Sequence, residues 1–148
     1  MLSEPPEVPE TVALKLAEAR VARLATIQPN GQPHVLPVCF VFDQGQFLTA
    51  LDRKPKRVPP ENLARVRNLQ AHPEAALIID HYSEDWNELW YVLVHGHADM
   101  IPPTASAEHG RAIQKLRAKY PQYSGSMLPA EALVIRITPE RMTWWGKI

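Results

Sequence analysis

Two tight turns join three consecutive β-strand patterns early in the chain, and this arrangement restricts the fold most strongly. The turn Pro29-Asn30-Gly31 follows an apolar run at 21–27, and the turn Asp43-Gln44-Gly45 separates runs at 34–42 and 46–51. Asn and Gly tolerate the positive φ angles that short hairpin turns require. Consecutive strands joined by such short connections pair antiparallel. The sequence therefore predicts an antiparallel meander in this part of the chain.

The remainder of the chain continues this mainly β pattern. Further strands are predicted at 75–82 and 90–101, separated by the polar loop 83–88, and a last strand or hairpin covers 132–138 and 141–145. About six strands in one chain, with short helices at the connections, indicate a small antiparallel β-barrel. We expect a single domain over 1–148, with residues 1–9 as a flexible start.

Three short helices are predicted from apolar residues at helical spacing. The first covers about Glu10 to Glu18, and the second carries Leu63, Val66 and Leu69 before Pro73. The third opens at Pro102-Pro103-Thr104, carries Ile113, Leu116 and Tyr120, and ends at Pro121. Each helix lies between two strand patterns or before the first one, as expected for covers of a barrel.

The composition excludes several functional classes. The 16 basic and 16 acidic residues cancel, whereas a general nucleic-acid binder would carry a basic excess. No apolar run approaches the roughly 18 residues that would indicate a membrane helix, and the acidic, proline-rich N-terminus is unlike a secretory signal. The single cysteine, Cys39, excludes an internal disulfide and fits a reducing cytoplasm; its apolar surroundings predict a buried small side chain.

One segment concentrates positive charge in a chain of zero net charge. Arg53-Lys54-Pro55-Lys56-Arg57 follows the third strand pattern and precedes the proline-started helix Pro59-Pro60-Glu61-Asn62-Leu63. Cations beside the unpaired N–H groups of a helix start favour a phosphate-bearing ligand. If the segment is extended, Lys54 and Lys56 point the same way. The other interpretation, a solvated basic turn, stays open.

Other polar residues give weaker indications. His95-x-His97 on one strand could begin a metal site with His81, but partly exposed histidines on a barrel are the favoured interpretation, so no metal is predicted. Trp144-Trp145 could stack on a ring or pack against other side chains. The acidic loop residues between 83 and 88 are interpreted as a solvated surface. No nucleophile triad or acid–base pair is legible, so the sequence does not identify the catalytic residues.

Several short segments have the order and spacing of a known superfamily. These are Arg23-Leu24-Ala25-Thr26, then 31–38, then Lys54-Pro55-Lys56 followed by Asn62-Leu63. Together they resemble the pyridoxamine 5′-phosphate oxidase-like FMN-binding split barrel superfamily. The segment from Asp80 to Trp90, with Glu84-Asp85-Trp86 inside it, resembles the branch that depends on the deazaflavin coenzyme F420.

The resemblance implies a six-stranded antiparallel split β-barrel of the FMN-binding type. It also implies a homodimer whose two cofactor sites lie at the subunit interface, and a cytoplasmic enzyme that transfers a hydride between coenzyme F420, or alternatively FMN, and a small organic substrate. No nucleic acid or membrane partner is implied. A non-catalytic protein that sequesters a cofactor or haem is the competing interpretation.

The resemblance also assigns roles to individual residues. Lys54 and Lys56 match the positions that bind the cofactor phosphate, and the strand Leu36-Pro37-Val38 matches the one that lies along the ring system. Thr49 would lie near the phosphate on a neighbouring strand, and Trp86 would approach from the partner subunit. Leu93 stands where the F420 branch is expected to carry Arg, so one cationic contact would be missing.

Overall fold

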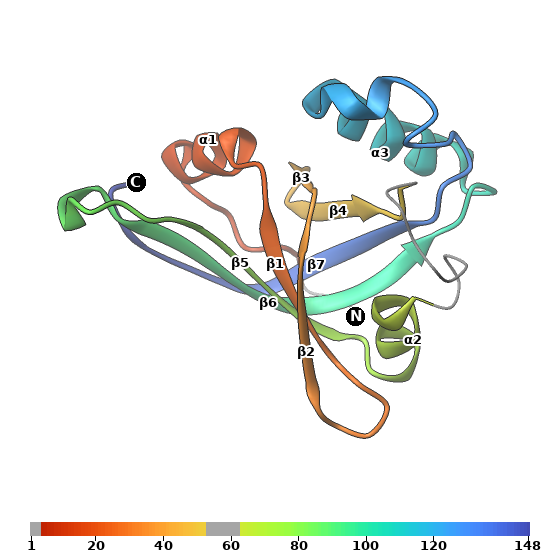
Figure 1. Ribbon diagram of the computed structural model, residues 1–148, viewed down its shortest axis with the longest axis horizontal. Helices are drawn as coiled ribbons and strands as arrows, with labels where there is room; N and C mark the ends of the chain where they lie inside the picture. Colours follow the sequence, from red (N-terminus) through yellow and green to blue (C-terminus); the bar gives the residue numbers. More distant parts are fainter. Residues whose placement is uncertain (1–3, 53–62) are drawn as a thin grey trace.

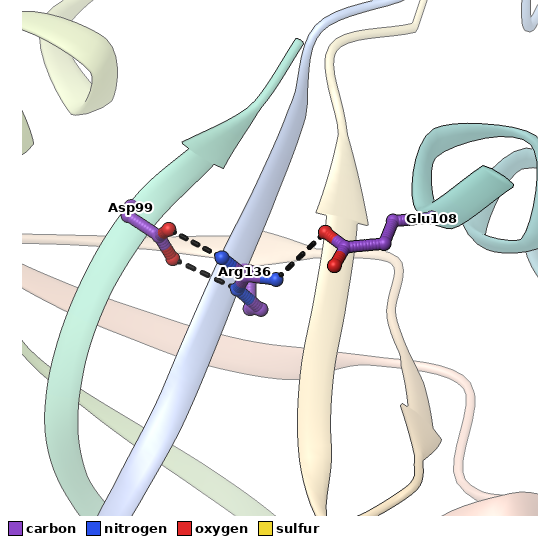
Figure 2. Close-up of polar contacts among 3 residues, drawn as sticks. All are labelled: Asp99, Glu108 and Arg136. Atoms are coloured by element: carbon purple, nitrogen blue, oxygen red, sulfur yellow. Dashed lines mark hydrogen bonds and ion pairs between the residues drawn. The ribbon is translucent and has the colours of Figure 1, made fainter. Parts of the chain in front are cut away.

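The computed structural model describes residues 4–52 and 63–148, and its strands form one strongly curled sheet (Figure 1). The strands are β1 (Ala22–Ile27), β2 (Pro33–Val38), β3 (Val41–Asp43), β4 (Gln46–Ala50), β5 (Glu74–His81), β6 (Trp90–Ile101) and β7 (Val134–Gly146). The helices are α1 (Glu10–Glu18), α2 (Ala64–Ala71) and α3 (Ser106–Lys119), with short 3-10 helices η2 (Trp86–Glu88) and η3 (Pro121–Ser124).

The described strands pair antiparallel in the order β2-β1-β5-β6-β7-β4-β3. The predicted mainly β, antiparallel split barrel is therefore confirmed. The sheet has seven strands rather than six, because the predicted strand 34–42 is interrupted at Cys39 and Phe40. The first half, β2, pairs with β1, and the second half, β3, pairs with β4. The meander is thus two hairpins.

The two residues at this interruption connect the two edge strands of the sheet. β2 and β3 are the first and last strands of the order, yet only Cys39 and Phe40 separate them along the chain. A sheet whose two edge strands are neighbours along the chain must curl, which brings these strands together at residues 39 and 40 without pairing them. We call residues 39 and 40 the corner. Cys39, expected to be a buried apolar residue within a strand, lies instead at the corner and is half-buried.

Tyr120, directly after α3, satisfies the backbone at the corner. Its hydroxyl accepts a hydrogen bond from the Phe40 N–H at 2.9 Å and lies 3.0 Å from the Phe40 carbonyl. The same hydroxyl lies 2.9 Å from the carbonyl of Arg20, just before β1, so its single proton can serve either oxygen. Burial raises the pKa of Tyr120 to about 12, which keeps this donor protonated.

Two backbone positions explain how the strands are connected. The turn between β3 and β4 has positive φ at Gln44 (53°) and Gly45 (77°), as a two-residue type I′ hairpin requires. A register shift beside His95 and Gly96 brings the backbone of β7 so close that a Cβ on Gly96 would lie 2.2 Å from the Thr138 carbonyl oxygen. The predicted segments 132–138 and 141–145 are therefore one irregular strand.

The helices close the open sides of the curled sheet. α1 buries Val12 and Leu16 in the main core, and α3 buries Ile113 and Leu116 in a second cluster against β3, β4 and β7. The Asn68 side chain of α2 donates to the Thr26 hydroxyl of β1 at 2.9 Å. Within the described residues, none of the helices is both long and apolar enough to span a bilayer.

Candidate functional site

The predicted ring-binding strand, β2, lies at one edge of the sheet. Among the described strands it pairs only with β1, so its other edge retains free backbone groups. Leu36 and Val38 turn toward the core, whereas Pro37 is exposed and lies opposite Arg23 of β1. A flat ring lying along this edge would meet backbone polar groups and aliphatic side chains together, as such rings require.

Of the residues predicted to lie at the cofactor phosphate, Thr49 belongs to the described part of the chain. Lys54 and Lys56 lie outside the described residues. Thr49 lies on β4, which pairs with β3 and β7 and not with β2. Its side chain is 3% exposed, so the surface of a single chain does not present it. The role of Thr49 at a cofactor phosphate therefore stays a prediction.

A buried polar cluster lies where β4 leads into the lysine-bearing segment. Asp52 is 6% exposed and accepts a hydrogen bond from the Tyr123 hydroxyl of η3. Burial, this hydrogen bond and a further one with Cys39 raise the pKa of Tyr123, so the phenol stays protonated. Sequence reasoning missed this cluster; an acidic residue closing an apolar strand was the only local signal.

Arg65 belongs to the same region. Burial lowers the pKa of its guanidinium, and the negative charge of Asp52 opposes that effect. Its Nε is buried without a hydrogen-bond partner among the described residues. A buried guanidinium nitrogen with an unfilled donor suits an anionic ligand group, because an unmade hydrogen bond to a charged group is costly.

Trp86 belongs to η2, in the connection between β5 and β6. This connection lies at the end of the sheet away from α2 (Figure 1). Trp86 is 72% exposed, so the single chain leaves its indole uncovered. The loop around it is ordered by local hydrogen bonds: the Asp85 carboxylate accepts from the Asn87 N–H at 3.1 Å, and the Ser83 hydroxyl accepts from the Asp85 N–H at 3.1 Å. One chain therefore does not bring Trp86 to β2 or β4.

Several apolar residues lie on the side of the sheet that is turned away from the core. We call this set of residues the outer face. Leu93 lies between Ile78 of β5 and Thr143 of β7, so the residue expected to be Arg extends this apolar surface instead. Tyr91 stacks on Trp145 with ring centroids 5.9 Å apart. The outer face consists of Val35, Pro37, Ile78, Tyr91, Leu93 and Trp145.

A cleft of about 480 Å³ opens between the end of α1, the start of β1 and the strand ends beside the Trp86 loop. The Trp90 ring lies in it, stacked on His81 at 6.4 Å, with the Lys15 ammonium 5.7 Å from its centroid. An Arg23–Asp80 ion pair of 3.1 Å forms part of its wall. Aromatic and charged groups together suit a polar ring-bearing ligand. The sequence indicated Trp90 and Arg23 only through the resemblance.

The histidines considered as metal ligands have separate neighbours. His95 Nδ1 lies 3.2 Å from Arg141 Nη2, and His97 Nδ1 lies 2.8 Å from a Glu140 carboxylate oxygen. Among residues 4–52 and 63–148, no group of three or more His, Cys, Asp or Glu side chains is arranged to hold a metal ion.

The comparison with protein families agrees with the split-barrel fold described above. Residues 8–146 match the family described as pyridoxamine 5′-phosphate oxidase. The chain belongs to the pyridoxamine 5′-phosphate oxidase family. Because this match covers nearly the whole chain, the split-barrel superfamily expected from the sequence is confirmed.

Solved structures with the same fold include proteins of different kinds. A conserved hypothetical protein from Mycobacterium tuberculosis shares 18% identity and a TM-score of 0.74, over 99% of this chain and 89% of that chain. A heme storage protein from Vibrio cholerae shares 16% identity and a TM-score of 0.72, over 96% of both chains. A protein named F420 reductase shares 22% identity and a TM-score of 0.67, over 92% of this chain and 98% of that chain. At these identities the likeness concerns the fold of this pyridoxamine 5′-phosphate oxidase family member.

Proposed function

We propose that this protein is an oxidoreductase that transfers a hydride between a flavin-type cofactor, coenzyme F420 in preference to FMN, and a small organic substrate. The observation that carries the proposal is the family match over residues 8–146. The similar fold of a protein named F420 reductase supports the choice of cofactor. We also propose a cytoplasmic location, as the sequence predicted.

The described residues fit such a cofactor. The open edge of β2 offers backbone donors and acceptors beside Leu36, and the exposed Pro37 ring lies next to it. Arg65 adds a buried nitrogen without a partner among the described residues, near the start of the lysine-bearing segment. A flat apolar ring with polar edges and an anionic tail needs these three kinds of group.

Each part of the chain would have a separate task. The cofactor supplies the hydride chemistry when bound, and the protein positions it and excludes water. Lys54 and Lys56 would hold its phosphate by charge-assisted hydrogen bonds, and β2 would orient the ring. We propose that Asp52 and Tyr123, linked by a buried hydrogen bond, fix the point where the lysine-bearing segment begins.

Equilibrium titration of the apo-protein with coenzyme F420 and with FMN tests the proposed cofactor. We expect tighter binding of F420, because the segment from Asp80 to Trp90 resembles the F420-dependent branch. Hydride transfer from the reduced cofactor to an artificial acceptor should then be faster with the protein than without it. FMN that stays bound through purification would make FMN the preferred cofactor. Cofactor binding without any acceleration of hydride transfer would contradict the proposed oxidoreductase activity.

A non-catalytic, haem-binding role is the second candidate. It is favoured by one observation, that heme storage and heme binding proteins from Vibrio cholerae and Mycobacterium smegmatis share this fold, with TM-scores of 0.72 and 0.71. An absorbance spectrum of the protein with added haem separates the candidates, since a bound haem gives a sharp Soret band. We expect no such band under conditions in which F420 or FMN binds.

We further propose a homodimer in which the outer faces of two subunits meet and Trp86 of each subunit completes the other's cofactor site. Exposed apolar residues gathered on one face can mark an interaction surface; here the Arg23–Asp80 ion pair separates Pro37 from Ile78. An interface of roughly 1,600 Å² or more is expected for a stable dimer. It would cover side chains that a single chain leaves in water, such as Val35 at 65% exposure.

Replacing Trp86 with Ala should weaken cofactor binding or dimerisation about tenfold or more, because a tryptophan that anchors an interface contributes at least 1–2 kcal/mol. Sedimentation velocity measures the assembly, and fluorescence titration measures the affinity. Leu14→Ala is the matched control, since Leu14 is also exposed but lies on α1, away from the outer face. A Trp86→Ala protein that dimerises and binds the cofactor as tightly as the parent would contradict the composite site.

A further inference from the structure

A second groove lies between α1 and α3, away from the strand edge proposed for the cofactor. Its volume is about 410 Å³, within the range of small-molecule sites. Val41 and Phe42 line it from β3, which lies between the two helices in Figure 1. Ala17 and Ala118 line it from the helix sides, and their short side chains leave the space open. We call this the α1–α3 groove.

The charges in the α1–α3 groove are unbalanced. Arg20, Lys115 and Lys119 line it, and within the described parts of the chain none of these three forms an ion pair with a carboxylate. Asp43 also lines the groove, but Arg111 holds both of its oxygens, at 2.8 and 3.0 Å. Three cations therefore share the groove with one carboxylate, whose hydrogen bonds go to Arg111 and whose charge also acts on Lys115.

Two of these cations already have a structural task that leaves donors unused. The Arg20 Nη1 donates to the Lys119 carbonyl at the end of α3 at 2.7 Å, and the Lys119 ammonium donates to the Leu16 carbonyl in the last turn of α1 at 3.2 Å, so the two side chains cap the ends of both helices. An ammonium has three donors and a guanidinium has five. The remaining donors, with those of Lys115, have no acceptor among the described residues.

The Lys119 ammonium is the most buried of the three cations, in its surroundings of aromatic rings and Arg20. It lies half-buried, 4.0 Å from the centroid of the Phe40 ring. Burial, and next the charge of Arg20, lower the pKa of Lys119 to about 8, while Cys39 acts weakly in the opposite direction. A bound anion in this groove would relieve the repulsion between the two cations.

We propose that the α1–α3 groove binds a small organic oxyanion, with its phosphate or carboxylate head between Lys119, Lys115 and Arg20 and its apolar body against Phe42. The head accepts hydrogen bonds from donors that the protein leaves free, and the body covers an aromatic face beside small alanines. This site is independent of the proposed cofactor site, since the groove contains no residue assigned to that site.

The proposal predicts a specific pH dependence. An oxyanion binds Lys119 better when it is charged, so binding raises the pKa of Lys119 from about 8. Affinity is then fully present below that pKa and falls as pH rises through it, by about tenfold between about pH 7 and about pH 9. The titratable or charged groups around Lys119 are Arg20 near α1, Cys39 at the corner, Tyr120 after α3, Lys115 on α3 and Asp43 on β3.

Isothermal titration calorimetry with phenyl phosphate and with benzoate tests the site and distinguishes the two kinds of head group. Lys119→Met should weaken binding of the preferred probe at least tenfold at about pH 7. Lys119→Arg should retain binding but lose the pH dependence, because arginine stays charged. Arg67→Met is the matched control and should bind as the parent does, since Arg67 is an exposed cation on α2, which contributes no residue to the groove.

Four results would overturn the proposal. The first is equal affinity in Lys119→Met and the parent, and the second is an unchanged pH profile in Lys119→Arg. The third is loss of probe binding in a Lys54→Ala/Lys56→Ala variant instead, which would assign the probe to the proposed cofactor site. Absence of binding by both probes at millimolar concentration would equally exclude the site. Thermal melting of each variant verifies that the comparison is between folded proteins.

Discussion

Replacing Lys54 and Lys56 together with alanine is expected to weaken FMN and F420 binding by at least tenfold. Each charge-assisted hydrogen bond to a phosphate contributes about 1.5–3 kcal/mol, so the loss of two exceeds one factor of ten. The two lysines flank Pro55, which limits the conformations of the segment that presents them. Fluorescence titration of the double variant and the parent measures the effect.

Riboflavin supplies the control for this experiment, since it has the same ring as FMN and no phosphate. If the lysines hold the phosphate, the double variant loses FMN affinity and keeps its weaker affinity for riboflavin. Equal losses for both compounds would indicate that the substitutions disturb the ring site. Unchanged affinity for FMN would mean that the basic segment is a solvated turn, the interpretation that the sequence left open.

Changing Tyr120 to Phe should lower the free energy of unfolding by about 2–3 kcal/mol. The substitution removes one hydroxyl and leaves the buried N–H of Phe40 without its partner, and an unsatisfied buried polar group costs about 1–3 kcal/mol. The carbonyls of Phe40 and Arg20 lose their donor as well. Urea denaturation followed by circular dichroism gives the difference directly.

Tyr82→Phe is the matched control for this loss, because Tyr82 is 63% exposed in the loop region before η2. We expect it to change stability by less than about 0.5 kcal/mol, as surface substitutions usually do. A Tyr120→Phe protein as stable as the parent would show that water replaces the phenol at the corner.

The sequence predicted the hairpins well because their turns carry strong local chemistry. Gly45 adopts the positive φ that its position indicated, and the strands flanking it pair in register. It did not predict the corner, because Val38 to Phe42 are all apolar and give no alternating pattern. The structure buries both Phe40 and Val41, at the point where pairing with β1 ends and pairing with β4 begins.

The candidate site was predictable to a smaller extent. The order of short segments indicated β2 and the Trp86 loop as parts of one site, which stays a prediction, and no periodicity relates them within one chain. The hydrogen bond between Asp52 and Tyr123 joins residues 71 positions apart, so only the folded chain brings them together. The charges of the α1–α3 groove likewise come from two helices whose contact no local pattern encodes.

The corner has a consequence for association between molecules. A free sheet edge can add a strand from another chain, which leads to aggregation. Here the curl ends in two edges that are poor templates: β3 has only three residues, and β2 contains Pro33 and Pro37, which lack the N–H that an added strand would need. The edge of β2 therefore resists continuous strand addition while its remaining backbone groups stay available to a small flat molecule. A protein built in this way can keep an open binding edge without becoming a nucleus for fibres.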